Sequence, residues 1–137
     1  MSKTIEIFNS SSLKYLPIKR AQKAVETTLK GESVSNAEVN VIYMDDPDIH
    51  QMNQEYLNHD YPTDVITFPL NETPLEGEIY IGAETAVKQA EEYKVSLTNE
   101  LLRLVIHGTL HLCGYDDATD EERHDMHLLE NKYLGLL

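Results

Sequence analysis

Two histidines stand four residues apart in the stretch HGTLHLCGYDD, which runs from His107 to Asp117. Residues four apart lie on one face of a helix, so the imidazoles of His107 and His111 can converge on a single ion. Two histidines and one carboxylate, with a fourth position open, form a known type of catalytic zinc site. The spacing therefore predicts a metal site completed by a carboxylate from the residues that follow.

Two glycines and two aspartates shape the chain around these histidines. Glycine in a helix interior is about 1 kcal/mol less favourable than alanine, so Gly108 indicates that another element approaches the helix closely there. Gly114 is expected to take the left-handed conformation that ends the helix, which turns Asp116 or Asp117 towards the ion. A histidine pair with this spacing, taken alone, is as typical of ordinary core or surface histidines as of metal ligands. The glycines and the paired aspartates favour a metal.

The residue types leave other metal chemistries to be weighed. Gly108 stands where the H-E-x-x-H motif of zinc peptidases has its glutamate, so the pattern disfavours proteolysis. Two histidines and a carboxylate also bind non-haem iron, and residue type alone does not exclude iron. We expect zinc, because histidines four apart on one helix followed by a third ligand suit it.

Further histidines and the lone cysteine lie close to the motif. His124 and His127 belong to the acidic segment DEERHDMHLLE and are expected on a solvated helix face. His124 is the reserve ligand if Asp117 points away from the ion. Helical phase turns Cys113 away from the histidine face, so we expect a small buried apolar side chain there.

Periodicity predicts the elements that position these residues. Strands are expected at residues 3–8 and 37–44, separated by a helix that opens at Leu16-Pro17 and stops at Gly31; a second helix starts with Asp46 as N-cap and Pro47 as its first residue. Strands at 64–68 and 78–81 fit a hairpin with a long loop, and three helices follow, at 83–93, from the N-cap Thr98 to 112, and from Thr119 to 134. The expected fold is α+β, with a four-stranded mixed sheet and about five helices. The apolar helix that ends at residue 112 is expected to be central.

Length and composition bound the class of protein. The 137 residues fit one domain, 1–137, with 41% apolar and 26% charged residues. No apolar run reaches the roughly 20 residues that span a bilayer, and the start MSKTIEIFNS lacks the apolar core of a signal peptide. A single cysteine forms no intrachain disulfide, which fits a cytoplasmic protein.

Charge is distributed unevenly along the chain. The net charge is −13, which disfavours a nucleic-acid partner, yet residues 1–30 carry +4 and residues 31–137 carry −17. The basic residues of the first predicted helix are typical of a solvated helix face. The alternative is that Lys19, Arg20 and Lys23 form a local basic surface on an acidic protein.

The motif HGTLHLCGYDD resembles H-G-x-L-H-L-x-G-Y-D-H of the YbeY family, which consists of single-strand-specific metallo-endoribonucleases that act in bacterial ribosomal RNA maturation. NQEYLNHDYPTDVITFPL and GEIYIG resemble two further motifs of that family. The resemblance implies a zincin-like fold, one zinc ion held by His107, His111 and Asp117, and cleavage of RNA by a metal-activated water. It also implies a cytoplasmic role in 16S rRNA maturation, ribosome assembly and quality control, with small-subunit proteins and an assembly GTPase as partners and no membrane.

Two positions depart from the family pattern. Asp117 stands in place of a third histidine; carboxylate oxygen binds zinc, but its charge leaves the ion less able to acidify water, so we expect a higher working pH. Leu57 stands in place of an arginine and cannot clamp a phosphate. His59 or a lysine of the first predicted helix is the candidate substitute.

The resemblance also places other residues near the cleft. Thr63 and Asp64 would border it and contact substrate, although Pro62-Thr-Asp is a turn signal in its own right. Asp116 matches an aspartate of the family and is expected to hydrogen-bond near the site. Two other functions fit the same ligands: a non-catalytic ribosome-assembly factor with a structural metal, and a metallohydrolase of a small molecule.

Overall fold

A computed structural model gives the structure of the chain and describes residues 2–61 and 63–137. The elements in chain order are β1 (Lys3–Asn9), α1 (Lys19–Gly31), β2 (Ala37–Met44), α2 (Asp46–Leu57), β3 (Val65–Asn71), β4 (Leu75–Gly82), α3 (Ala83–Tyr93), α4 (Leu97–Leu112) and α5 (Asp120–Leu134). The described residues thus form the four strands and five helices that the periodicity predicts. None of these helices is long and apolar enough to cross a membrane.

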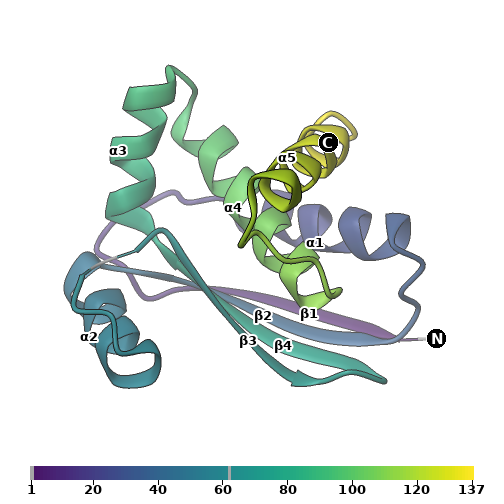
Figure 1. The fold of residues 1–137 in the computed structure, drawn as a ribbon. Helices are drawn as coiled ribbons and strands as arrows, with labels where there is room; N and C mark the ends of the chain where they lie inside the picture. The colour runs from purple at the N-terminus through teal and green to yellow at the C-terminus, as the bar shows by residue number, and fades with distance from the viewer. Residues whose placement is uncertain (1, 62) are drawn as a thin grey trace.

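The strands form one mixed sheet in the order β1-β2-β4-β3. Neighbours β1, β2 and β4 run parallel, and β3 pairs antiparallel with β4 at the edge. Helices α1, α3, α4 and α5 lie over one face, and α2 lies at one end of the sheet, where its first turn contacts α3 (Figure 1). The predicted α+β fold with a mixed sheet is confirmed.

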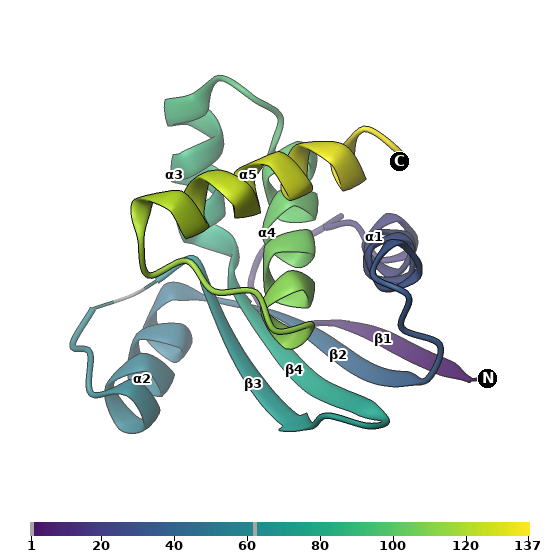
Figure 2. The ribbon, with the colours of Figure 1, turned by 45° about the vertical axis from the view of Figure 1, so that its right-hand side comes forward.

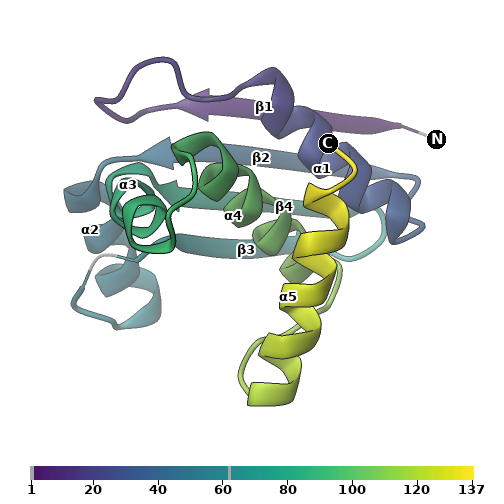
Figure 3. The same ribbon diagram turned by 90° about the horizontal axis from the view of Figure 1, so that it is seen from above.

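The core lies between this sheet face and the helices. Val39, Val41 and Tyr43 of β2 are fully buried, while the residues between them are more exposed, as alternation along a half-covered strand requires. Helix α4 lies on the sheet, α5 crosses over it, and α1 lies beside it (Figure 2). The view from above shows the same helices stacked over the strands (Figure 3). Helix α4 is therefore the central helix that its apolar composition predicts.

Helix α4 and strand β4 approach one another through two glycines. A Cβ at Gly108 would lie 2.6 Å from Cγ2 of Ile79, and a Cβ at Gly77 would lie 2.4 Å from Cδ2 of Leu112. Each glycine thus makes room for a large side chain of the other element. The close approach expected at Gly108 is confirmed, and the element involved is the sheet.

Helices α1 and α2 begin later or are capped differently than the sequence predicts. Helix α1 begins at Lys19, not at Leu16-Pro17, and the carbonyl of Pro17 instead accepts a hydrogen bond of 2.6 Å from the hydroxyl of Tyr43. The N-cap of α2 is Asp45, not Asp46. Asp46 lies in the first turn, where its backbone N–H donates to Glu84 of α3.

The predicted N-cap is wrong for α4 and correct for α5. Ser96, not Thr98, caps α4, because its hydroxyl oxygen accepts from the backbone N–H of Asn99 at 3.0 Å. Thr119 caps α5 as expected, and it forms a capping box with Glu122.

The hairpin is confirmed, but its long loop is not. Strands β3 and β4 extend into the turn-rich segment, so only residues 72–74 lie between them. Pro69 fits within β3 because β3 is an edge strand, where a missing backbone N–H need not break the ladder.

Candidate metal centre

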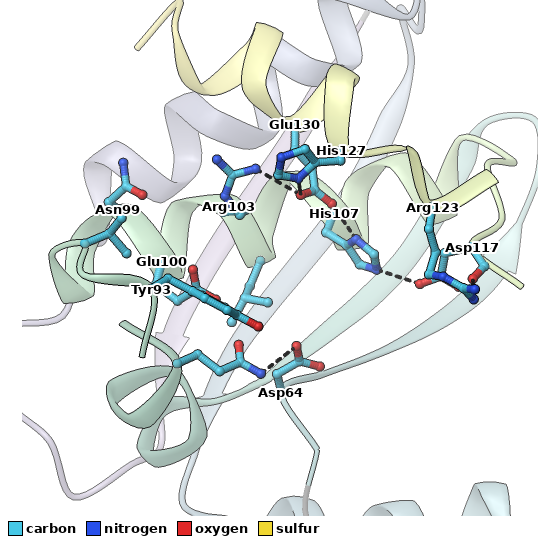
Figure 4. Close-up of a pocket in the computed structure, with 13 residues that line it drawn as sticks. Asp64, Tyr93, Asn99, Glu100, Arg103, His107, Asp117, Arg123, His127 and Glu130 are labelled. Carbon is cyan, nitrogen blue, oxygen red and sulfur yellow. Dashed lines mark hydrogen bonds and ion pairs between the residues drawn. The ribbon is translucent and has the colours of Figure 1, made fainter. Parts of the chain in front are cut away.

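His107, His111 and Asp117 meet at the C-terminal end of α4. Each offers one ligand atom, and these atoms lie within 4.8 Å of one another. Nε2 of His107 is 3.3 Å from Oδ2 of Asp117, and Nε2 of His111 is 3.5 Å from Oδ1 of the same carboxylate. Figure 4 shows the imidazole of His107 facing Asp117. The two imidazoles and the carboxylate therefore face one point.

These separations fit a single metal ion. Ligand atoms bound at about 2.0–2.1 Å to one tetrahedral zinc ion lie about 3.3–3.4 Å apart. The histidines approach different oxygens of Asp117, at 3.3 and 3.5 Å, and one ligand atom from each of the three residues lies within 4.8 Å of the other two, so small side-chain movements would bring all three to one ion. The side chains of His107, His111 and Asp117 are 18%, 23% and 37% exposed, so the point they face is reached by solvent. The residues fit a metal whose coordination is left partly open.

The turn after α4 places Asp117. Gly114 has a φ of +105°, so it takes the positive φ that the sequence predicts and reverses the chain. The carboxylate of Asp116 accepts a hydrogen bond of 2.8 Å from the backbone N–H of Asp117, and Arg123 donates to the backbone carbonyl of Asp117 at 3.2 Å. Asp116 lies outside the ligand group found among the described residues. It holds the turn, in line with the hydrogen-bonding role expected for it.

Glu130 of α5 contacts Nδ1 of His107, the ring nitrogen that faces away from Asp117. Its Oε2 lies 2.6 Å from Nδ1 of His107, and its Oε1 accepts from Arg103 at 3.1 Å. A hydrogen bond at Nδ1 leaves Nε2, which faces Asp117, free to bind a metal. Sequence reasoning missed Glu130. The signal was present, because Glu130 shares the buried face of α5 with Met126 and Tyr133, where a charged residue needs a partner.

Opposing effects act on the charge of His107. Burial disfavours the imidazolium, but the hydrogen bond and charge of Glu130 outweigh burial, with smaller contributions from Asp117 and Asp64, so the pKa of His107 is raised. A metal at Nε2 competes with this proton. Metal binding at the site should therefore weaken as the pH falls.

A cavity of about 590 Å³ opens beside His107 and Asp117. It is lined by Asp64, Gln89, Tyr93, Val95, Asn99, Glu100, Arg103, Leu104, His107, Asp117, Arg123, His127 and Glu130. These side chains come from α3, α4 and α5, from the loops after α3 and α4, and from Asp64 just before β3 (Figure 4). Asp64 accepts a hydrogen bond from Gln89 at 3.1 Å and a longer one, 3.5 Å, from the hydroxyl of Thr63, the residue before it. The structure thus places Asp64 beside the candidate site.

Other candidate residues lie elsewhere. His124 is exposed and, among the described residues, is part of neither the ligand group nor the cavity lining. The ring of His59 stacks on Tyr61 with centroids 5.3 Å apart, away from that lining. His127, expected on a solvated face, is 61% exposed in its side chain but lines the cavity. Cys113 is half-buried against the core, and burial raises its pKa to about 11.

Helix α4, its close contact with the sheet and the open His/His/Asp group define an α+β protein with a candidate metal centre. Related sequences identify its family. The chain belongs to the family described as Endoribonuclease YbeY, whose model matches residues 6–137. The family resemblance of the HGTLHLCGYDD motif is thereby confirmed.

Individual relatives match over most of their length. The chain is 43% identical to the Endoribonuclease YbeY of Chloroherpeton thalassium, over 89% of this chain and 87% of that protein. It is 38% identical to the Endoribonuclease YbeY of Chlorobium phaeovibrioides, over 98% and 90%. The solution structure of TM1509 from Thermotoga maritima matches with a TM-score of 0.71 and 35% identity, over 96% of this chain and 87% of that one.

Proposed function

We propose that residues 1–137 form a single-domain, metal-dependent endoribonuclease that acts in ribosomal RNA processing. Membership of the Endoribonuclease YbeY family supports the activity. The observation that carries the proposal is the convergence of His107, His111 and Asp117 beside a cavity that His107 and Asp117 line. Phosphodiester hydrolysis needs an activated water and stabilisation of charge on phosphate oxygen, and an open metal site supplies both.

Zinc is the proposed ion. When bound, it would supply a water of lowered pKa and a positive charge beside the scissile phosphate. His107 and His111 would present Nε2 to the ion, Asp117 one carboxylate oxygen. Glu130 keeps the proton of His107 on Nδ1, where the two side chains lie 2.6 Å apart. The carboxylate of Asp64 lies at the cavity wall, where it can accept a proton or a hydrogen bond from substrate.

The basic face of α1 is the proposed path for the rest of the RNA. Lys19, Arg20 and Lys23 are exposed. Arg20 lines a small pocket together with Asn99, and Asn99 also lines the cavity beside the metal site. A strand held along α1 would thus lead towards the site. Replacing all three basic residues should weaken RNA binding and flatten its salt dependence; unchanged affinity and salt slope would contradict this path.

Leu57 carries no charge to replace the arginine of the family pattern. It ends α2, 43% exposed, and His59 follows it outside the cavity lining of the described residues. Arg103 and Arg123 do line the cavity. We propose that these arginines, rather than His59, supply positive charge to the phosphate, since guanidinium groups form strong bonds to phosphate oxygen.

A purely structural metal is the competing function. A structural zinc site is closed by four protein ligands, whereas three converge here and the point they face is open to solvent. The hydrophobic core between the helices and the sheet does not include the side chains of His107, His111 and Asp117. The metal-free protein should therefore stay folded, and we expect thermal melts with and without chelator to show one cooperative transition each. Complete unfolding on metal removal would favour the structural role.

The proposed biological setting follows from the reaction. Processing of 16S rRNA would place the protein in the cytoplasm, with small-subunit proteins and an assembly GTPase as partners. The direct test is a labelled unstructured RNA incubated with protein that has been stripped of metal and then supplied with zinc. Cleavage that depends on added metal supports the proposal, and metal-independent cleavage or none contradicts it.

A further inference from the structure

The cavity extends well beyond the metal ligands. Its far wall is formed by Tyr93 and Val95, which follow or end α3, and by Asn99 and Glu100 in the first turn of α4. Pockets of roughly 300–1,000 Å³ hold small ligands in proteins, and this cavity of about 590 Å³ falls in that range. The far wall therefore has room for a part of the substrate other than the scissile phosphate.

Glu100 is the unusual residue of this wall. It is only 3% exposed and takes part in none of the side-chain hydrogen bonds or ion pairs of the described residues; because its oxygens are not among fully buried unpaired atoms, they reach the cavity that Glu100 lines. Figure 4 shows the group in the cavity, beside Tyr93 and on the same helix as His107. Burial raises the pKa of Glu100; the charge of Arg103 opposes this shift, and those of Asp64 and Glu130 add to it. Such a group is suited to accept hydrogen bonds from a ligand.

Tyr93 supplies an aromatic surface beside this acceptor. Its side chain is 59% exposed at the end of α3, and in Figure 4 it lies next to Glu100 and extends towards Asp64. Proteins that bind single-stranded RNA stack bases on such rings and read the base edges with hydrogen bonds. An acceptor beside an exposed ring, in a cavity that continues to the metal site, matches that arrangement.

The donors of the four bases differ on their Watson–Crick edges. Guanine presents two adjacent donors, N1–H and the N2 amine, which match the two oxygens of one carboxylate. Adenine and cytosine present an amine beside an unprotonated ring nitrogen, and uracil presents one N–H between two carbonyl oxygens. A carboxylate repels those acceptors, so among the four bases it favours guanine.

We propose that this wall is a guanine-binding pocket, in which Tyr93 stacks on the base and Glu100 accepts from N1–H and the N2 amine. The inference rests on the proposed function and adds to it a preference for RNA with an unpaired guanine next to the cleaved bond. Glu100 is thus a residue of base selection and has no part in activating water.

The test measures binding of the 5′-monophosphates of guanosine, inosine, adenosine, cytidine and uridine to the full chain with zinc bound. All five carry the same phosphate, so differences in affinity report the base. A bidentate pair discriminates by at least about fivefold, so guanosine monophosphate should bind that much more tightly than the adenosine and uridine compounds. The inosine compound lacks the N2 amine and should bind with intermediate affinity.

Two substitutions and one control make the assignment specific. Glu100→Gln should reduce guanosine monophosphate to the affinity of the other nucleotides, and Tyr93→Ala should weaken all five together. Glu92→Gln, at an exposed position next to Tyr93, should change nothing. Circular dichroism checks that each variant is folded.

The results separate this inference from the nuclease proposal. Equal binding of the guanosine and inosine compounds, or an unchanged preference in folded Glu100→Gln, overturns the guanine pocket even if RNA is cleaved. A guanosine preference that Glu100→Gln abolishes supports the pocket, whether or not RNA cleavage is observed.

Discussion

Glu130 should control how tightly the site holds its metal. Its carboxylate is 6% exposed and lies 2.6 Å from Nδ1 of His107, a short hydrogen bond between a buried acid and a candidate ligand. Partners of this kind orient the imidazole and raise its basicity, and their loss weakens metal binding by about 10–100-fold. Glu130→Gln keeps the volume and one acceptor oxygen, so we expect a loss near tenfold. Glu130→Ala removes both and leaves Arg103 without its partner, so its loss should approach a hundredfold.

The assay is a competition titration of zinc against a chelating dye, for the wild type and both variants. Asp125→Asn serves as the control, because Asp125 is exposed on the same helix and its loss removes the same charge. A general electrostatic effect would weaken binding in this control as much as in Glu130→Gln. Wild-type zinc affinity in folded Glu130→Ala would refute the role assigned to this residue.

Three further predictions address the ligand turn, the helix–sheet contact and the base wall. Asp117→His should keep the metal and move the pH–rate profile to lower pH, because a neutral ligand leaves the ion better able to acidify water; a profile unchanged or moved to higher pH would contradict the role of Asp117. Gly108→Ala places a Cβ 2.6 Å from Ile79 and should destabilise the fold by about 1 kcal/mol in urea denaturation, since overpacking of about 1–3 kcal/mol exceeds the gain in helix propensity; a stabilised variant would show that the approach is not tight. Burial raises the pKa of Glu100, so this residue holds its proton more strongly in the folded protein than in the unfolded chain. The stability that Glu100 contributes is therefore lost as the pH rises from the ordinary pKa of glutamate through the raised one. Glu100→Gln should therefore gain stability over the wild type as the pH rises from 4 to 7, and equal stability at both ends would contradict this sign.

The convergence of His107, His111 and Asp117 could be predicted because its information is local. His107 and His111 are one helical turn apart, and Gly114 returns the chain so that Asp117 meets them. Every step uses residues within one short stretch. Choosing Asp117 over Asp116 needed the family pattern, and the structure adds the reason, since the Asp116 carboxylate is bonded to the turn itself.

Glu130 and the cavity wall could not be found in that way. Glu130 is 23 residues from His107, and the two meet only because α5 packs across α4. A charged residue on a buried helix face indicates that a partner exists but does not identify it. The same holds for Glu100, whose surroundings come from α3 and from Asp64 just before β3 as well as from its own helix.

The predicted ends of helices and strands were wrong where two neighbouring residues were both suitable and tertiary contacts decided between them. Asp45 and Asp46 could each cap α2, but the Asp45 position begins the helix while Asp46 is held by Glu84 and Thr85 of α3. The sequence predicts a long β3–β4 loop because the segment PLNETPLEG holds two prolines and a glycine, yet Pro69 lies within β3. Because β3 lies at the sheet edge, a proline need not interrupt it.

The central claim is that the site formed by His107, His111 and Asp117 cleaves RNA. The most direct measurement follows a labelled, unstructured RNA with purified wild type, His111→Ala and the control His124→Ala, all with added zinc and shown to be folded and free of other nucleases. We predict cleavage by the wild type and by His124→Ala, and none by His111→Ala. Equal cleavage by His111→Ala, or intact RNA with all three proteins, would contradict the account.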